Sequence, residues 1–182
     1  MTGQPSQYFE FKVRGIAMDA KTKTPILLLQ DHGARLMLPI KVGGFEAAAI
    51  VVALEKRSLS RPMTHDLMAN LFGVLDARLL SADICSLSES TFFAVLRLKD
   101  QRGEVRLVDC RPSDAVALAI RLDVPIRVEA SVLEAAQPAP EGEEGIDATP
   151  MNFVADDDHE GRERLLANLA EMNPEDFGDF EM

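Results

Sequence analysis

Hydrophobic and polar residues alternate along the first clearly patterned segment of the chain, from Tyr8 to Met18. The apolar side chains at positions 9, 11 and 13 fall on one side, and the charged side chains at positions 10, 12 and 14 fall on the other. A repeat of two residues is typical of a half-buried strand. Patterning and turn residues predict six further strands, at 25–30, 35–42, 77–87, 91–99, 104–110 and 125–129.

Three longer segments have the composition and start signals of helices. Residues 45–57 are rich in Ala and apolar on nearly all sides, so we expect a helix that is deeply covered. A second helix has Thr64 as its N-cap and Asp66 in its first turn. A third begins at Arg111 and Pro112, because Pro is favoured in the first turn, and runs to Leu122. One more helical turn is expected at 132–136.

A weak internal repeat relates the first and third of these helices. Residues 28–50 can be aligned with residues 97–120, so that each segment contains a strand, a Gly turn, a strand, a loop and an Ala-rich helix. The alignment places Glu46 opposite Asp114. A duplicated hairpin–helix unit and a chance match of two common units explain it equally well. Both predict an α+β domain with a mainly antiparallel sheet and packed helices.

The negative charge of the chain is concentrated towards its C-terminal end. The net charge is −11, but from Glu141 onward 14 acidic residues face two arginines, a balance of −12, which leaves +1 for residues 1–140. Attraction to phosphates depends on local patches of charge. The acidity of the whole chain therefore does not exclude a nucleic-acid ligand.

This composition divides the chain into three regions. Residues 1–137 form the domain, 138–158 an acidic linker rich in Pro and Gly, and 159–182 a short helical acidic tail. Leu165, Leu166, Leu169 and Met172 share one face of the expected tail helix. Because a lone helix of this length is marginal in water, we expect the tail to dock on its own core or on a protein partner.

The sequence also predicts where the protein works. No run of 18 apolar residues occurs, so no segment is expected to span a membrane, and the N-terminal residues lack the pattern of a secretory signal. Cys85 and Cys110 lack metal-ligand spacing and are expected to be free thiols. We therefore expect a cytoplasmic protein.

Three motifs resemble a known family. LPIKVGGFEA at 38–47, RPMTHDL at 61–67 and VDCRPSDAVALA at 108–119 are similar in order and spacing to the bifunctional nuclease domain, and TFFA at 91–94 and VPI at 124–126 add to the resemblance. The resemblance covers residues 7–137. It implies a nuclease that acts on RNA and DNA with little sequence preference, on a compact α+β domain that tends to self-associate. It assigns no catalytic residues.

The densest group of polar residues lies where the strand at 104–110 meets the third helix. Phosphodiester hydrolysis needs an activated water and stabilisation of negative charge on the phosphoryl group. We expect Asp109, Arg111 and Asp114 to be catalytic, with Asp109 pointing inward and both aspartates holding Mg²⁺ or Mn²⁺.

Other helix starts supply further candidates. Backbone N–H groups at a helix start favour an anion, and glycines permit its close approach, so contacts to nucleic acid are expected from Arg111, Ser113, Gly43 and Gly44. His65 is a candidate proton carrier. The metal set is completed by Glu46 and Asp66.

Each candidate also has a structural explanation. Asp114 at the third helical position fits a helix cap, and Glu46 fits a partner of the helix dipole. Asp109 fits a bond to Arg111, and His65 fits a surface residue.

Two classes of function follow. The first is a low-specificity, metal-assisted nuclease for RNA and DNA. The alternative is a non-catalytic homo-oligomeric module that binds a protein or a small anion, with the tail as a regulatory arm. The near-neutral domain and the scarcity of aromatic residues (5%) favour the alternative. In a combined form, the acidic tail mimics nucleic acid and covers the site.

Overall fold

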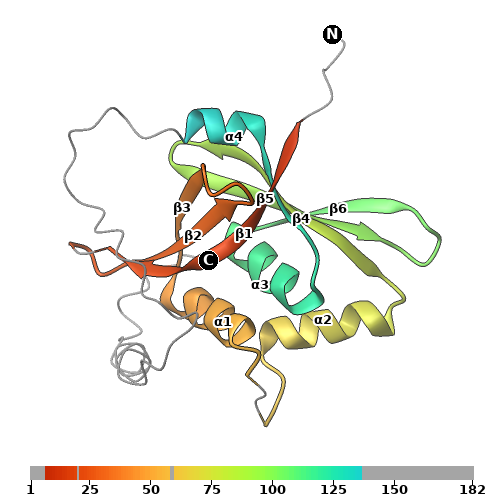
Figure 1. The fold of residues 1–182 in the computed structure, drawn as a ribbon. Coiled ribbons are helices and arrows are strands. Elements are labelled where there is room, and N and C mark those ends of the chain that lie inside the picture. Colours follow the sequence, from red (N-terminus) through yellow and green to blue (C-terminus); the bar gives the residue numbers. More distant parts are fainter. Residues whose placement is uncertain (1–6, 20, 58–59, 137–182) are drawn as a thin grey trace.

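The computed structural model describes residues 7–19, 21–57 and 60–136, and Figure 1 shows them as a curved sheet with four helices. The expected linker and tail, 138–158 and 159–182, lie outside the described residues. The strands are β1 (Tyr8–Met18), β2 (Pro25–Asp31), β3 (Met37–Lys41), β4 (Arg78–Ser88), β5 (Thr91–Lys99), β6 (Val105–Cys110) and β7 (Ile126–Glu129). The helices are α1 (Gly44–Leu54), α2 (Thr64–Val74), α3 (Pro112–Leu122) and α4 (Ala130–Ala135).

The seven strands lie in the order β3-β2-β1-β7-β4-β5-β6. Five of the six neighbouring pairs are antiparallel, and β4 with β7 is the parallel pair. The α+β class and the mainly antiparallel sheet are thus confirmed. The hairpin–helix units β2–β3–α1 and β5–β6–α3 lie towards opposite edges of the sheet, with β7 in the centre. Their origin by duplication stays a hypothesis.

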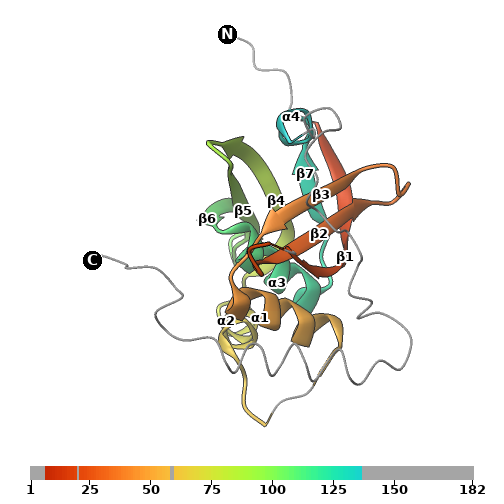
Figure 2. The ribbon, with the colours of Figure 1, turned by 90° about the vertical axis from the view of Figure 1, so that its left-hand side faces the viewer.

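Helix α3 is the centre of the helical layer. Figures 1 and 2 place α1, α2 and α3 together on one side of the sheet, with α4 at the opposite end. Ala115, Val116, Ala117 and Ala119 are at most 1% exposed, because α3 packs against α1, α2, β4 and β5. Small Ala side chains permit these elements to approach closely at the high density of protein interiors. The start of α3 is fixed by Pro112 at its first position.

The outer side of α1 differs from the prediction. Ala47 and Ile50 are buried, but Phe45 is 63% exposed and residues 51–54 are only half-buried. The expected deep cover is therefore wrong for the described residues, since α3, β2 and β1 cover only one side of this helix. The apolar outer side remains accessible.

The N-cap of helix α2 lies one residue earlier than the predicted Thr64. Met63 is the N-cap and Thr64 the first helical residue, because the Met63 backbone N–H donates to the Asp66 carboxylate over 2.9 Å. Leu67, Leu71 and Leu75 are 54%, 45% and 63% exposed, and leave an apolar strip on the surface. No helix in the described part of the chain has the length and apolar character needed to cross a bilayer. The cytoplasmic location stays a prediction.

Candidate functional site

The starts of α1, α2 and α3 meet at one place. Each helix carries an acidic residue at its third position, which is Glu46 in α1, Asp66 in α2 and Asp114 in α3. Acidic residues are favoured there by the partial positive charge of the helix start. Two of the three, Glu46 and Asp114, are joined through Arg111, the residue that precedes α3.

Arg111 bridges two carboxylates. Its Nη1 lies 2.9 Å from Glu46 Oε1, and its Nε and Nη2 donate to Asp114 Oδ2 and Oδ1 over 2.8 and 3.2 Å. The side chain is still 65% exposed. A guanidinium has five N–H donors, so these contacts leave two of them for a further acceptor.

Asp114 also holds His65. His65 Nε2 lies 3.0 Å from Asp114 Oδ1, and the His65 side chain is 10% exposed. The hydrogen bond with His65, together with that from Arg111, lowers the pKa of Asp114 to about 2, although burial acts in the opposite direction. Asp114 is thus ionised at neutral pH, and Nε2 must carry the proton of this bond. In a neutral ring, Nδ1 is then the proton acceptor. Asp114 binds side chains of two elements and makes no side-chain cap of α3.

A pocket of about 620 Å³ opens beside Arg111. Its wall includes Gly43, Ser113, Lys41 and Thr91, from the starts of α1 and α3 and from neighbouring strands. Three of the four residues predicted to contact nucleic acid, Arg111, Ser113 and Gly43, are therefore brought together. The fourth, Gly44, follows Gly43 as the buried first residue of α1.

Asp66 belongs to a separate contact. Its Oδ1 accepts a hydrogen bond from Arg121 Nε over 2.5 Å, and its other oxygen binds the Met63 backbone. The hydrogen bond from Arg121, followed by that from Met63, lowers the pKa of Asp66. Asp66 therefore fixes the start of α2 against the end of α3.

The expected inward direction of Asp109 is wrong. Asp109 is exposed, and it lies on the same face of β6 as Val105 and Leu107, which are 51% and 59% exposed. The reason is the position of β6 at the edge of the sheet, where none of the described helices packs against it. No hydrogen bond or ion pair joins Asp109 to Arg111 or Asp114 within the described residues.

The four predicted metal ligands do not form one set of donors. Glu46 and Asp114 contact Arg111, Asp66 contacts Arg121, and Asp109 is exposed on β6. Across 7–19, 21–57 and 60–136, no three His, Cys, Asp or Glu side chains are placed to hold a metal ion. Binding of Mg²⁺ or Mn²⁺ stays a prediction, and the positions of these four side chains do not fit it.

Gly43 makes room for the Glu46 carboxylate. A Cβ at Gly43 would overlap Glu46 Oε2, whereas the backbone (φ −71°, ψ 160°) accepts any residue. We expect Gly43→Ala to displace the Glu46 side chain and break its ion pair with Arg111, at a cost of about 1 kcal/mol or less from the poorer helix cap. Glu46→Gln removes the same pair, so the two variants should change cleavage of nucleic acid by the same factor.

The double variant provides the check on this prediction. If both substitutions act through one ion pair, Gly43→Ala/Glu46→Gln should be no worse than either single variant in a cleavage assay. Effects that multiply would contradict the shared cause.

Sequence reasoning missed Asp83 and Arg121. Asp83 is 0% exposed in β4 and pairs with Arg127 and Arg97 at 2.6 and 3.3 Å. A charged residue inside the apolar stretch LLSADIC was the available signal. For Arg121, at the end of an Ala-rich helix, the sequence offers no comparable signal, because its partner Asp66 lies 55 residues away.

Comparisons with known proteins identify the family of this chain. The bifunctional nuclease domain matches residues 26–141, which include every residue of the site. Two proteins of Mycobacterium tuberculosis (strains CDC 1551 and H37Rv), described as uncharacterized, are each 36% identical over 168 residues, or 92% of this chain and 97% of theirs. Bifunctional nucleases 1 and 2 of Arabidopsis thaliana are 26% identical over 105 residues, which is 57% of this chain and 32% of each of those proteins.

Proposed function

Because the chain belongs to the bifunctional nuclease domain family, we propose that it is a low-specificity nuclease that hydrolyses phosphodiester bonds of RNA and DNA. The observation that carries the proposal is the position of Arg111. It is exposed at the starts of three helices, beside a pocket, and it is linked through Asp114 to a histidine.

In this proposal the phosphate binds in the pocket beside Arg111. With a neutral His65, the cluster of Arg111, Glu46 and Asp114 carries a net charge of −1, so its charge alone does not attract an anion. The attraction comes from backbone N–H groups at the starts of α1 and α3 and from the two remaining N–H donors of Arg111. Ser113 and Lys41 supply further polar contacts at the pocket wall.

His65 is the proposed proton carrier. Asp114 binds Nε2 and thereby leaves Nδ1 as the acceptor of a proton from water. The oxygen of that water forms a bond to phosphorus, the bond between phosphorus and the leaving oxygen breaks, and the proton taken up by His65 passes to the leaving oxygen. Arg111 stabilises the negative charge that develops on the phosphoryl oxygens.

Metal assistance remains a part of the proposal that needs its own test. An ion held by Glu46 and Asp114 would first have to displace Arg111 from both carboxylates. No step above depends on a metal.

The test is cleavage of end-labelled single-stranded RNA and double-stranded DNA by the purified full chain with Mg²⁺, with Mn²⁺ and with EDTA. We expect both substrates to be cut. Cleavage that EDTA abolishes would establish the need for a metal, and equal cleavage in EDTA would show that the reaction proceeds without one. No cleavage of either substrate would contradict the nuclease.

A second candidate, a homo-oligomeric module, is supported by the apolar strip on α2. Leu67, Leu71 and Leu75 are exposed beside Val74, which is 77% exposed, and contiguous apolar surface of this kind marks interaction sites. We propose that this strip joins copies of the chain. Self-association is compatible with both functions.

Substitutions on α2 test the strip. We expect Leu71→Ser/Leu75→Ser to lower the molar mass measured by light scattering to that of the 20.0 kDa monomer, because the apolar contact is lost. Val105→Ser/Leu107→Ser, on the equally exposed β6, is the matched control and should leave the mass unchanged. An unchanged mass in the α2 variant would contradict this interface.

A further inference from the structure

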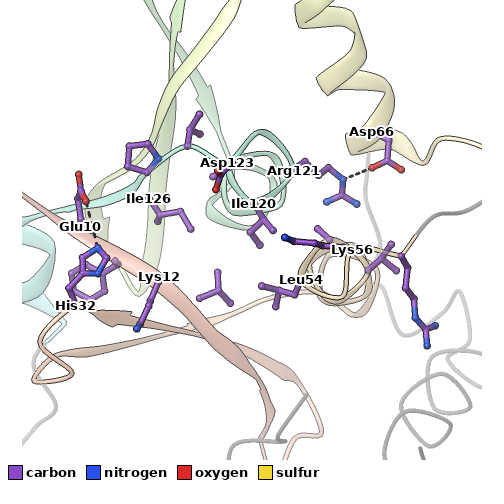
Figure 3. A pocket seen from close by; sticks show the side chains of 18 residues that line it. Glu10, Lys12, His32, Leu54, Lys56, Asp66, Ile120, Arg121, Asp123 and Ile126 are labelled. Carbon is purple, nitrogen blue, oxygen red and sulfur yellow. Dashed lines mark hydrogen bonds and ion pairs between the residues drawn. The ribbon is translucent and has the colours of Figure 1, made fainter. Parts of the chain in front are cut away.

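A second and larger groove lies at the opposite end of α3 from the candidate site. Figure 3 shows it between β1, the end of α1 and the end of α3. Its volume is about 980 Å³. Phe11 and Ile126 form part of a buried apolar floor, and the half-buried Leu54, Ile120 and Val124 extend it. The groove therefore suits an apolar occupant.

The rim of the groove carries lysines without a partner. Lys12 comes from β1 on one side, and Lys56 follows α1 on the other (Figure 3). No hydrogen bond or ion pair joins either lysine to another residue in the described part of the chain. Arg57, also at the rim, is paired with Glu55 at 2.6 Å. The two lysines are thus available to an acidic occupant.

One N–H group of Arg121, which lines this groove, lacks an acceptor among the described residues. Its Nε binds Asp66 and its Nη1 donates to the Ala117 carbonyl over 2.9 Å, but its buried Nη2 has no acceptor among the described residues. The side chain is only 8% exposed. A buried donor without an acceptor is unfavourable. An acidic side chain that enters the groove beside Arg121 would supply the acceptor.

We propose that the acidic tail of the same chain, residues 159–182, binds in this groove. The apolar residues Leu165, Leu166, Leu169 and Met172 would contact the floor, and the acidic residues between and beyond them would lie near the two lysines. The tail thus matches the groove both in its apolar spacing and in its charge.

The charge also distinguishes this groove from the other exposed apolar surface. The strip on α2 lies in a segment, THDLMANLFGVLD, that contains no Lys or Arg and ends at Asp76, whereas the groove is lined by four basic and three acidic side chains. An acidic tail would be repelled there. The groove is therefore the better place for the tail, and the α2 strip remains for contacts between copies.

The linker is long enough to reach the groove from the end of α4. Its 21 residues, 138–158, span up to about 70 Å when extended, whereas a domain of this size has a radius of gyration of about 14 Å. A tethered segment of this kind has an effective concentration in the millimolar range. Even a weak contact in the groove would therefore be occupied most of the time.

The tail is not peculiar to this chain. The similarity to the two Mycobacterium tuberculosis proteins covers 92% of the chain, so it must extend well beyond residue 136 into the tail. A tail that binds the domain gives a reason for such similarity beyond residue 141, where the family match ends.

The test uses a single fluorescent reporter, because the chain contains no Trp. We expect Met172→Trp in the full chain to emit at shorter wavelength than Phe153→Trp, which lies in the linker. Lys12→Glu/Lys56→Glu should abolish that shift, whereas Lys23→Glu/Arg102→Glu, which makes the same change of charge at exposed sites away from the groove, should preserve it. Adding Glu163→Lys/Glu171→Lys to the groove variant should restore the shift.

Three results would overturn the proposal. One is equal emission from the two reporters, which means a solvated tail. Another is a shift that survives Lys12→Glu/Lys56→Glu in a protein with unchanged circular dichroism, which places the tail elsewhere. The third is a shift that is lost on dilution, which assigns the contact to another copy. None of these measurements depends on nuclease activity, so the two proposals can fail separately.

Discussion

Replacement of Asp114 by Asn is expected to reduce cleavage of RNA and DNA by about 10²- to 10⁴-fold, the usual contribution of a positioned proton carrier. The Asp114 carboxylate accepts hydrogen bonds from His65 and from Arg111. An amide is uncharged, and its NH₂ group would replace one of the two accepting oxygens by a donor that faces a donor of Arg111 or His65. The loss should appear in initial rates measured at saturating substrate.

Asp109→Asn is the matched control for this variant. It makes the same chemical change five positions earlier in the chain, at an exposed residue of β6 that contacts neither Arg111 nor His65 among the described residues. We expect its cleavage rate to stay within about twofold of the wild type, as for most exposed positions. Equal losses in the two variants, or no loss in either, would remove Asp114 from the site.

The pKa of Asp114 gives this variant a second signature. Because the hydrogen bonds with His65 and Arg111 lower its pKa to about 2, the carboxylate stabilises the fold above pH 4 and loses this effect as the pH falls towards 2. The shift corresponds to about 2 kcal/mol at neutral pH. Asp114→Asn should therefore lower the free energy of unfolding at pH 7 and have little effect at pH 2.

The sequence predicted the positions of strands and helices better than the direction in which individual side chains point. All seven strands and the starts of α1 and α3 are found within a few residues of their predicted positions, because a period of two residues and the Arg111–Pro112 start are local signals. The direction of Asp109 was wrong, because exposure depends on the place of β6 in the sheet order, which the pattern of β6 does not contain.

The candidate site shows the same limit. The internal repeat correctly placed Glu46 and Asp114 at equivalent helix positions, and both contact Arg111. The link from Asp114 to His65 joins residues 49 positions apart and depends on how α2 crosses α3, so no local pattern could predict it. The wrong expectation for α1 has a related cause, because its apolar outer side forms one wall of the groove. Docking of the tail would supply the cover that the helix pattern predicts.

Asp83→Asn is expected to cause the largest loss of stability, towards the lower end of about 3–5 kcal/mol. Asp83 is fully buried on the sheet, where Arg127 donates two hydrogen bonds to it over 2.8 and 2.6 Å and Arg97 a third over 3.3 Å. Arg127 also lies over the Tyr8 ring, at 5.1 Å from its centre. Loss of the carboxylate leaves two guanidinium charges uncompensated. We expect a loss of stability at the lower end of this range because the side chains of both arginines remain partly exposed, Arg127 at 27% and Arg97 at 34%.

The pH dependence separates loss of this charge from a general packing defect. Burial alone would raise the pKa of Asp83, but the hydrogen bond from Arg127 and the charges of Arg127 and Arg97 outweigh it and leave the pKa below its usual value. The charge therefore stabilises the fold above about pH 4, the range of an unfolded Asp, and the effect is lost as the pH falls below it. Urea unfolding of wild type and Asp83→Asn should differ most near pH 7 and converge at low pH. A difference that is constant with pH would mean that the variant disturbs packing, and an unchanged urea midpoint at pH 7 would mean that water replaces the ion pairs at no cost.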